Sequence, residues 1–282
     1  MKSKFAFLFI IFFIFITPGI GQEQPCYFIM LADPQFDMYE LDKGFSRETA
    51  NYEFAVAAIN RLKPAFVIVL GDLVNKSGDK GQIDEFLRIS RKIDPSIPIH
   101  FVAGNHDVGH EPTPEMLDSY RQNIGPDYYS FRSGPIYGIV LNSALIYEPR
   151  KVEAEYEKQN SWLKKELEKA KASGAPQIII FQHHPYFLGN AEEPFQFWNT
   201  PPDRRRPLLE LLNSYGILYV FAGHVHRNSA AKDGELEMTG TGPVGMPMGP
   251  DDSGIRLASA TAEGVQHCYF SFGRMPDRLA LK

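Results

Sequence analysis

The chain has 282 residues, of which 44% are hydrophobic and 22% are charged. This is not the composition of a disordered protein, and it supplies enough apolar residues for a large core. The formal net charge of -5 argues against nonspecific nucleic-acid binding, because such binding needs a basic face. We therefore expect no nucleic-acid partner. The length fits one or two domains.

The first residues, MKSKFAFLFIIFFIFITPGIGQ, form a segment of their own. Lys2 and Lys4 precede an unbroken apolar run at 5–16, and small residues follow, which is the order of a secretory signal. The run is shorter than the ~20 residues that a membrane span needs. We expect a signal peptide at 1–21, a mature domain at 22–282 without a stable membrane span, and an exported protein, periplasmic or secreted. An uncleaved N-terminal anchor is the alternative.

Apolar runs of strand length alternate with helical patterns along the mature chain. The runs lie at 27–32, 65–70, 98–103, 136–141, 176–182 and 217–222, and the helical patterns at 47–63, 83–94, 152–174 and 203–216. Near-continuous Val, Ile, Leu and Phe in the runs indicates strands that are buried on both faces. Four shorter strand-like segments then follow, NSAAK, ELEMTG, GIRLASA and VQHCYFSF. The pattern predicts an α/β fold with layered sheets flanked by helices.

The chain has two cysteines, Cys26 and Cys268, and both lie in strand-like segments at opposite ends of the mature chain. An exported protein can hold disulfides, so one bridge could join the first strand to the last. Two buried free thiols are equally compatible with the sequence.

Five of the apolar runs end directly on polar residues that can bind metal. These ends are Asp33-Pro34-Gln35, Gly71-Asp72, Gly104-Asn105-His106-Asp107, His183-His184-Pro185 and Gly223-His224-Val225-His226. In an open α/β sheet, ligands bind beyond the carboxyl ends of the strands. Each cluster alone is a weak signal, but together they predict one metal or catalytic site.

The set formed by Asp33, GD at 71–72, GNHD at 104–107, HHP at 183–185 and GHVH at 223–226 resembles the calcineurin-like metallophosphoesterase superfamily. ADPQF, DYYSF, LNS and FQHHP are similar to its small one-domain, serine/threonine phosphatase-like branch. The resemblance implies a four-layer α/β/β/α sandwich of two mixed β-sheets flanked by helices. It also implies hydrolysis of phosphate esters by a hydroxide that bridges two divalent metal ions.

The resemblance further implies a role for each polar residue at the strand ends. The implied ligands are Asp33, Gln35 and His226 for the first ion, Asn105, His183 and His224 for the second, and Asp72 as the bridge. Two such ions clamp the attacking and leaving oxygens of an in-line displacement. His106 then fits a general acid for the leaving oxygen. Asp107 fits the group that orients the His106 ring, in preference to a simple cap of the turn.

Gln35 departs from the superfamily pattern, in which a histidine is expected at this position. Relatives that also read ADPQF carry the same glutamine, so the resemblance treats it as a feature of the branch. An amide oxygen or water in place of an imidazole makes the first shell richer in oxygen. We therefore expect Mn²⁺, Mg²⁺ or Fe rather than Zn²⁺ at the first site.

We expect a phosphomonoesterase that acts on a phosphoprotein or on a small phosphate ester. A phosphodiesterase or nucleotidase of the same superfamily is the alternative among enzymes. A non-catalytic binding protein on a degenerate metal site is the alternative of another class, and Gln35 is the feature that favours it. The oligomeric state has no signal in the sequence.

Three weaker features lie near the expected site. The aromatic segment at 186–199 either packs a long loop onto the body or lines a substrate cleft. The glycine-rich segment at 240–249 is read as a flexible loop, or as a rim of the site. The three arginines at 204–206 are read as a solvated helix face.

Overall fold

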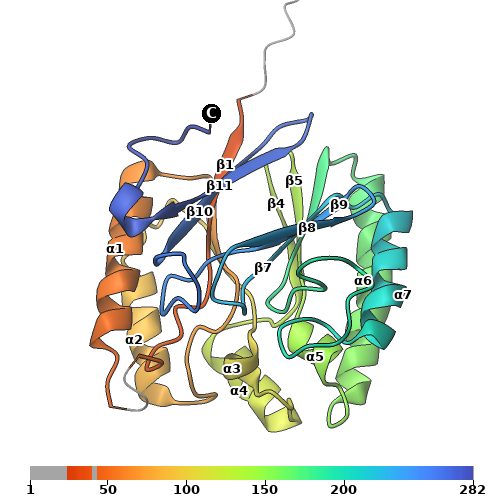
Figure 1. The fold of residues 1–282 in the computed structure, drawn as a ribbon, viewed down its shortest axis with the longest axis horizontal. Helices are drawn as coiled ribbons and strands as arrows, with labels where there is room; N and C mark the ends of the chain where they lie inside the picture. Colours follow the sequence, from red (N-terminus) through yellow and green to blue (C-terminus); the bar gives the residue numbers. More distant parts are fainter. Residues whose placement is uncertain (1–23, 40–42, 282) are drawn as a thin grey trace, which may run out of the picture.

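The computed structural model describes residues 24–39 and 43–281, so the expected signal peptide at 1–21 lies outside the described residues. Two β-sheets pack face to face between two pairs of helices (Figure 1). The first sheet has the strand order β11-β10-β1-β2-β3, and the second has the order β4-β5-β6-β7-β9-β8. Both sheets are mixed, since β1 pairs with β2 in parallel and with β10 in antiparallel orientation, and β5 pairs with β6 in parallel and with β4 in antiparallel orientation.

The strands of the first sheet are β1 (Cys26–Leu31), β2 (Phe66–Val69), β3 (Ile99–Phe101), β10 (Gly254–Ala260) and β11 (Val265–Ser271). The strands of the second sheet are β4 (Tyr129–Ser133), β5 (Ile136–Val140), β6 (Gln177–Phe181), β7 (Tyr219–Ala222), β8 (Ser229–Asp233) and β9 (Leu236–Gly240). The outer helices are α1 (Ser46–Leu62), α2 (Lys80–Ser90), α6 (Glu153–Ala172) and α7 (Pro202–Ser214). Shorter helices are α3 (Asn105–Val108), α4 (Pro114–Asn123), α5 (Ser143–Tyr147) and the 3₁₀ turn η1 (Phe272–Arg274).

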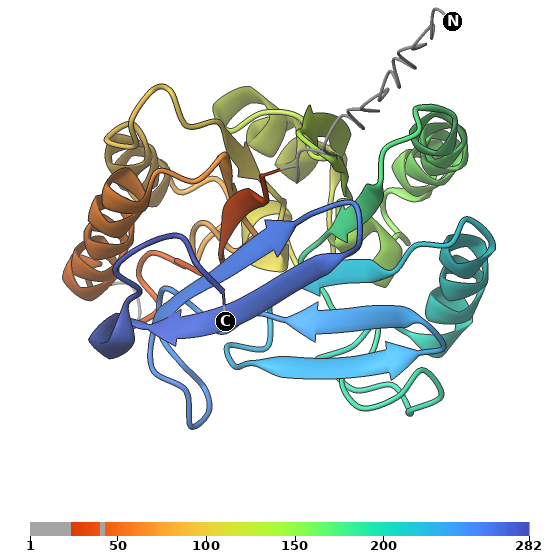
Figure 2. The same cartoon turned by 90° about the horizontal axis from the view of Figure 1, so that it is seen from above.

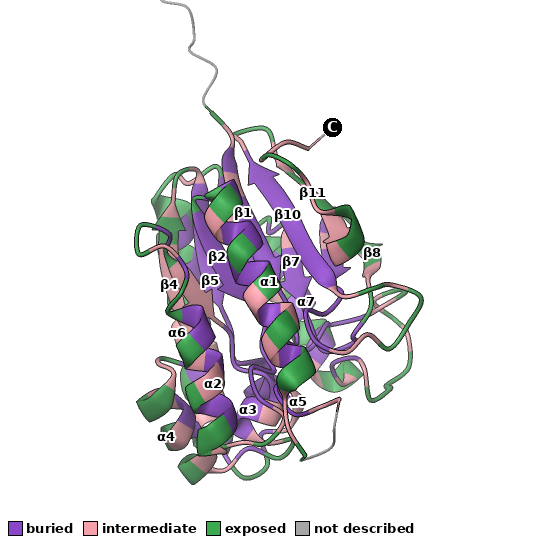
Figure 3. Cartoon of the chain, turned by 90° about the vertical axis from the view of Figure 1, so that its left-hand side faces the viewer, coloured by how far each residue is buried: buried purple, intermediate pink, exposed green. Residues whose placement is uncertain are grey.

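The four layers follow from the strictly alternating directions of side chains along each strand. In β1, Phe28 points between the sheets and stacks on Phe66 with ring centroids 4.8 Å apart, whereas Ile29 joins the core beneath α1 and α2. A third core lies between the second sheet and helices α6 and α7. Figure 2 shows the two helix pairs on opposite flanks, and Figure 3 shows α1 with an exposed outer face over buried strands. The expected four-layer sandwich is confirmed.

Parallel pairing brings the functional strand ends to one edge. β1, β2 and β3 run parallel in the first sheet, as do β5, β6 and β7 in the second. Their carboxyl ends therefore meet at the same end of the molecule, near α3 and α5 in Figure 1. The edge strand β4 and the helices α3, α4 and α5 have no counterpart among the expected strands and helices.

The structure excludes the bridge between Cys26 and Cys268, because both thiols are free. Cys26 is buried in β1 and Cys268 is exposed in β11, and β10 lies between these two strands. No helix among residues 24–39 and 43–281 is long and apolar enough to span a bilayer.

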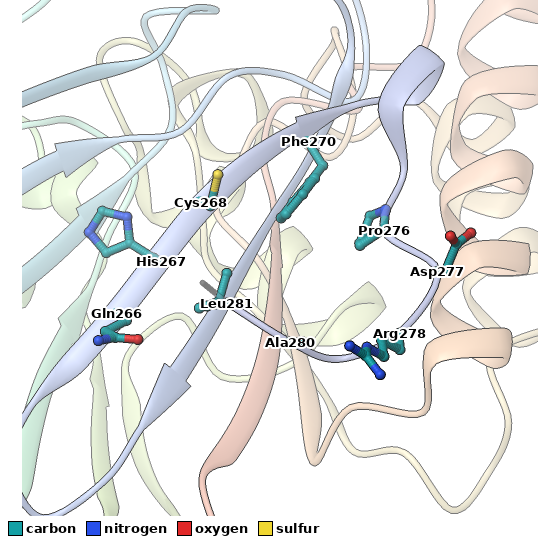
Figure 4. A pocket seen from close by; sticks show the side chains of 9 residues that line it. All are labelled: Gln266, His267, Cys268, Phe270, Pro276, Asp277, Arg278, Ala280 and Leu281. Carbon is teal, nitrogen blue, oxygen red and sulfur yellow. The ribbon is translucent and has the colours of Figure 1, made fainter.

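A cavity of about 750 Å³ lies between β11 and the C-terminal segment (Figure 4). Side chains from both elements line it, including Cys268, Phe270 and Leu281. None of the predicted site residues lines it, so this cavity is not the predicted metal site.

Candidate metal centre

Two groups of potential metal ligands form where the loops after the strands converge. One group contains Asp33, Asp72 and His226, and the other contains Asp72, His183 and His224. Within each group the ligand atoms lie within 4.8 Å of one another, and all five residues are buried. Asp72 belongs to both groups, as expected for a bridging carboxylate.

Two amide side chains complete these groups. The Nε2 of Gln35 donates to Asn75 Oδ1 at 3.0 Å, whereas the buried Gln35 Oε1 has no hydrogen-bond partner. A buried oxygen without a partner is costly unless something else binds it, and a cation would do so. In the other group, Asn105 Oδ1 lies 3.1 Å from His183 Nε2. The Asn105 oxygen therefore lies beside a ligand histidine, and the Gln35 oxygen is left without a protein partner.

Backbone carbonyls orient the three imidazoles. His183 Nδ1 donates to Leu70 O at 2.8 Å and His226 Nδ1 donates to Met246 O at 2.6 Å, which leaves both Nε2 atoms toward the site. His224 is turned the other way, because its Nε2 donates to Phe197 O at 3.2 Å and leaves Nδ1 inward. Such carbonyl partners fix the ring and the tautomer of metal-binding histidines.

Burial and close opposite charges shift the pKa values of the site residues. Burial raises the pKa of Asp33, against the opposing effect of His226. Burial acts in the same direction on Asp72, but His183 and His106 hold the pKa of Asp72 well below its ordinary value. In turn, although burial alone would lower it, Asp72 raises the pKa of His183 to about 9. Burial and His183 lower the pKa of His224 to about 3. The carboxylates therefore favour positive charge at this place, which a bound cation would supply.

The backbone is strained at the same positions. Non-glycine residues rarely adopt a left-handed conformation. Among the described residues the site residues with positive φ are Asp33 (48°), Gln35 (37°), Asp72 (49°), His224 (73°) and His226 (51°). Concentrated strain of this kind is typical of functional sites. It turns the side chains at the strand ends toward one point.

Two motif glycines allow the loops to approach closely. A Cβ at Gly71, which has φ of 87°, would lie 2.5 Å from the His183 ring. A Cβ at Gly104 would lie 2.2 Å from Asp72 Oδ1. The glycines of GD and GNHD are therefore required because the neighbouring ligands occupy their side-chain space.

His106 lies at the open side of the site and is only half-buried. Its backbone N–H donates to Asp72 Oδ1 at 2.8 Å, and its Nδ1 donates to the Asn75 carbonyl at 2.7 Å. The ring is therefore held in place with Nε2 free. Asn75 also holds Gln35, so one residue positions both the amide and the imidazole.

The orienting role expected for Asp107 is wrong. Asp107 Oδ1 accepts the backbone N–H groups of Leu73 and Val74, and Oδ2 accepts that of Gly104 at 2.8 Å. It ties the loop after β2 to the loop after β3, which is the capping alternative. The Asn75 carbonyl orients His106 instead.

Sequence reasoning missed two supports. Ser143 Oγ accepts the backbone N–H groups of both His183 and His184, at 3.2 and 2.8 Å, and so fixes the end of β6. The segment at 240–249 is not a free loop, because Val244 N donates to Ala32 O and Met246 O holds His226. The LNS sequence is a signal that could have identified Ser143. The backbone carbonyls that hold the histidines have no such signal in the sequence.

A double sheet whose strand ends bring together two ligand groups with a shared carboxylate defines a dinuclear metallohydrolase. The residues fit divalent cations, since buried carboxylates and imidazole nitrogens come together in two groups and a buried Gln35 oxygen has no protein partner.

The calcineurin-like phosphoesterase profile matches residues 28–228, and the chain belongs to this family. The chain is 34% identical to serine/threonine-protein phosphatase CPPED1 of Bos taurus over 269 residues, which cover 90% of this chain and 86% of the relative. It is 33% identical to the Homo sapiens protein over 270 residues, with the same coverage. The chain is therefore a hydrolase that acts on phosphoric ester bonds in a metal-dependent reaction.

Solved structures share the fold at low identity. A dimetal phosphatase from Danio rerio has a TM-score of 0.57 and 18% identity, and the match covers 88% of this chain and all of that one. GAP50, described as the anchor in the inner membrane complex of Plasmodium, has a TM-score of 0.67 and 16% identity, with 89% and 86% covered.

Proposed function

We propose that the protein is an exported phosphomonoesterase that acts on phosphoproteins or on small phosphate esters. The observation that carries this proposal is the position of His106, whose backbone N–H donates to the shared carboxylate Asp72 and whose Nδ1 is held by the Asn75 carbonyl, so that Nε2 is left for the substrate. The names of the CPPED1 relatives support a phosphoprotein substrate. The N-terminal segment at 1–21 supports export, with an uncleaved anchor as the alternative.

The ligands of the proposed metal pair are those that the two groups bring together. Asp33, Asp72, His226 and the Gln35 oxygen would hold one ion, and Asp72, His183, His224 and the Asn105 oxygen would hold the other. When bound, the two ions would neutralise phosphate charge and lower the pKa of a coordinated water. The oxygen-rich set around Gln35 favours Mn²⁺, Mg²⁺ or Fe over Zn²⁺.

The chain's own residues supply the remaining chemistry. In its protonated form His106 keeps one N–H on the Asn75 carbonyl and has a second at Nε2. That second N–H would donate to the leaving oxygen as the ester bond breaks, which is general acid catalysis. The bond from the His106 backbone to Asp72 keeps this donor in register with the shared ligand.

A substrate panel tests the monoester assignment. The purified mature protein with added Mn²⁺ should hydrolyse p-nitrophenyl phosphate and phosphopeptides faster than bis-p-nitrophenyl phosphate. Faster turnover of the diester would favour the phosphodiesterase alternative instead. Mass spectrometry of the exported protein tests the cleavage site, which is expected after Gly21.

A further inference from the structure

Two charged side chains, Arg205 and Glu193, hold the loop between β6 and α7. Arg205 is only 1% exposed, and it donates to the carbonyls of Tyr186, at 3.1 Å, and of Glu193. The Glu193 carboxylate accepts the backbone N–H groups of Leu188 and Gly189, both at 2.8 Å. The expectation of a fully solvated arginine face is therefore wrong for Arg205. These bonds fix the loop in one conformation.

This fixed loop divides its aromatic side chains between two roles. Tyr186 and Phe187 are buried and pack the loop onto the core beneath α7. Phe195 and Phe197 are 52% and 49% exposed. A large apolar ring in water loses the free energy that its burial would provide, so two such rings on a fixed loop indicate a contact surface.

The exposed rings lie beside the reacting groups. The Phe197 ring centroid is 5.4 Å from that of His224 and 5.9 Å from that of His110. His110 in turn lies 4.9 Å from the His106 ring. Phe197 thus contacts the candidate ligand His224 directly, and His110 lies between Phe197 and the proposed acid His106. The leaving group would depart toward His106.

Tyr147 of α5 extends this surface and fixes it. Its hydroxyl donates to Phe197 O at 3.2 Å, and its ring lies 5.9 Å from the Phe195 ring. The Phe197 carbonyl therefore accepts hydrogen bonds from both Tyr147 and His224. The backbone of Phe197 supports the metal centre while its side chain remains free for a ligand.

We propose that Phe195 and Phe197, with Tyr147, form an aromatic platform that binds the organic group of the substrate. The platform makes the enzyme prefer phosphate monoesters whose leaving alcohol carries an aromatic or large apolar group next to the ester oxygen. This inference rests on the proposed monoesterase function and deepens it. Ring-on-ring contact favours such groups over polar ones of similar size.

Two alkyl monoesters test the platform, 2-phenylethyl phosphate and glycerol 2-phosphate. For the wild type, kcat/KM should be higher for the phenylethyl ester. In Phe197→Ala the ratio of the two kcat/KM values should fall about 3- to 10-fold, mainly through KM, because one aromatic contact is lost and the backbone carbonyl is kept. Phe195→Ala should lower the ratio by a smaller factor. Phe54→Ala is the matched control, since Phe54 is 47% exposed on α1 and contacts Phe272.

Binding without turnover gives a second measurement. The inhibition constant of 2-phenylethylphosphonate should rise about 3- to 10-fold in Phe197→Ala, while that of methylphosphonate should change by less than about 2-fold. An unchanged ratio, or equal losses for both esters, would overturn the platform. If the wild type hydrolyses neither ester but does hydrolyse diesters, the monoesterase proposal fails separately.

Discussion

The two sheets supply different chemistry to the metal centre. The loops after the first-sheet strands supply oxygen ligands, and those after the second-sheet strands supply imidazoles. The candidate oxygen ligands are Asp33, Gln35, Asp72 and Asn105, and the candidate imidazoles are His183, His224 and His226. Buried carboxylates repel each other, and the imidazoles opposite them relieve that repulsion. Neither sheet therefore holds a complete site, and cations bound there would link the sheets.

Asp72→Asn is expected to give the largest effect, because Asp72 serves both ligand groups. Turnover should fall by more than the ~10²–10⁴-fold that general acid catalysis contributes. Metal analysis should find neither ion retained. Asp84→Asn, on the exposed face of α2, is the control that should keep both properties. An Asp72→Asn protein with full metal content would break the shared-ligand assignment.

His106→Ala should lower kcat by about 10²–10⁴-fold. Because His106 is not among the ligand groups, the variant should keep its metal content. Steady-state kinetics and metal analysis on one preparation check both points. Loss of metal together with activity would make His106 part of the ligand shell.

Removal of metal should loosen the contact between the sheets. At a free ion concentration of 100 times Kd, binding stabilises the native state by about 2.7 kcal/mol. For a chain of this size a chelator should therefore lower Tm by roughly 5–10 °C. Calorimetry with and without EDTA measures the change. His183→Ala should show a smaller decrease in Tm on chelation. An equal decrease would show that the stabilisation does not come from metal bound at this centre.

Gln35→His should add an imidazole to the candidate ligands that the first sheet supplies. Affinity for Zn²⁺ at the first site should rise by about 10-fold, which is the scale that changes in the ligand environment produce. Competition titrations with a zinc indicator measure it. No change in affinity would place residue 35 outside the coordination shell.

The sheets also meet away from the metal, where His267 of β11 donates to Glu237 of β9 at 2.7 Å. His267 lowers the pKa of Glu237 to about 2, below the ordinary 4.5. A depressed carboxyl pKa stabilises the fold above pH 4.5, and the contribution is lost as the pH falls toward 2. Partial exposure limits it to about 1 kcal/mol.

Glu237→Gln removes this contribution, so urea unfolding at pH 6 should show the variant less stable than the wild type. At pH 3 the difference should be smaller. A constant difference across that range would show that the pair is held by packing rather than by charge.

Much of the fold and the site was predictable from sequence, because the signals are local. Apolar runs mark buried strands, and Asp33, Asp72 and the histidine motifs follow them directly. Position after a parallel strand is enough to bring such residues to one edge. Strand β4 was missed because its residues are partly exposed and mixed in polarity.

The sequence by itself determined which side chains come together as candidate metal ligands, since each of them follows a strand within a short motif. Only the tertiary structure decided what holds them. The carbonyls of Asn75, Leu70, Met246 and Phe197 orient the four histidine rings of the centre, and every residue has a carbonyl, so no residue type announces this role. Burial of Arg205 and exposure of Phe197 were likewise set by the folded loop, because both depend on contacts between residues distant in sequence.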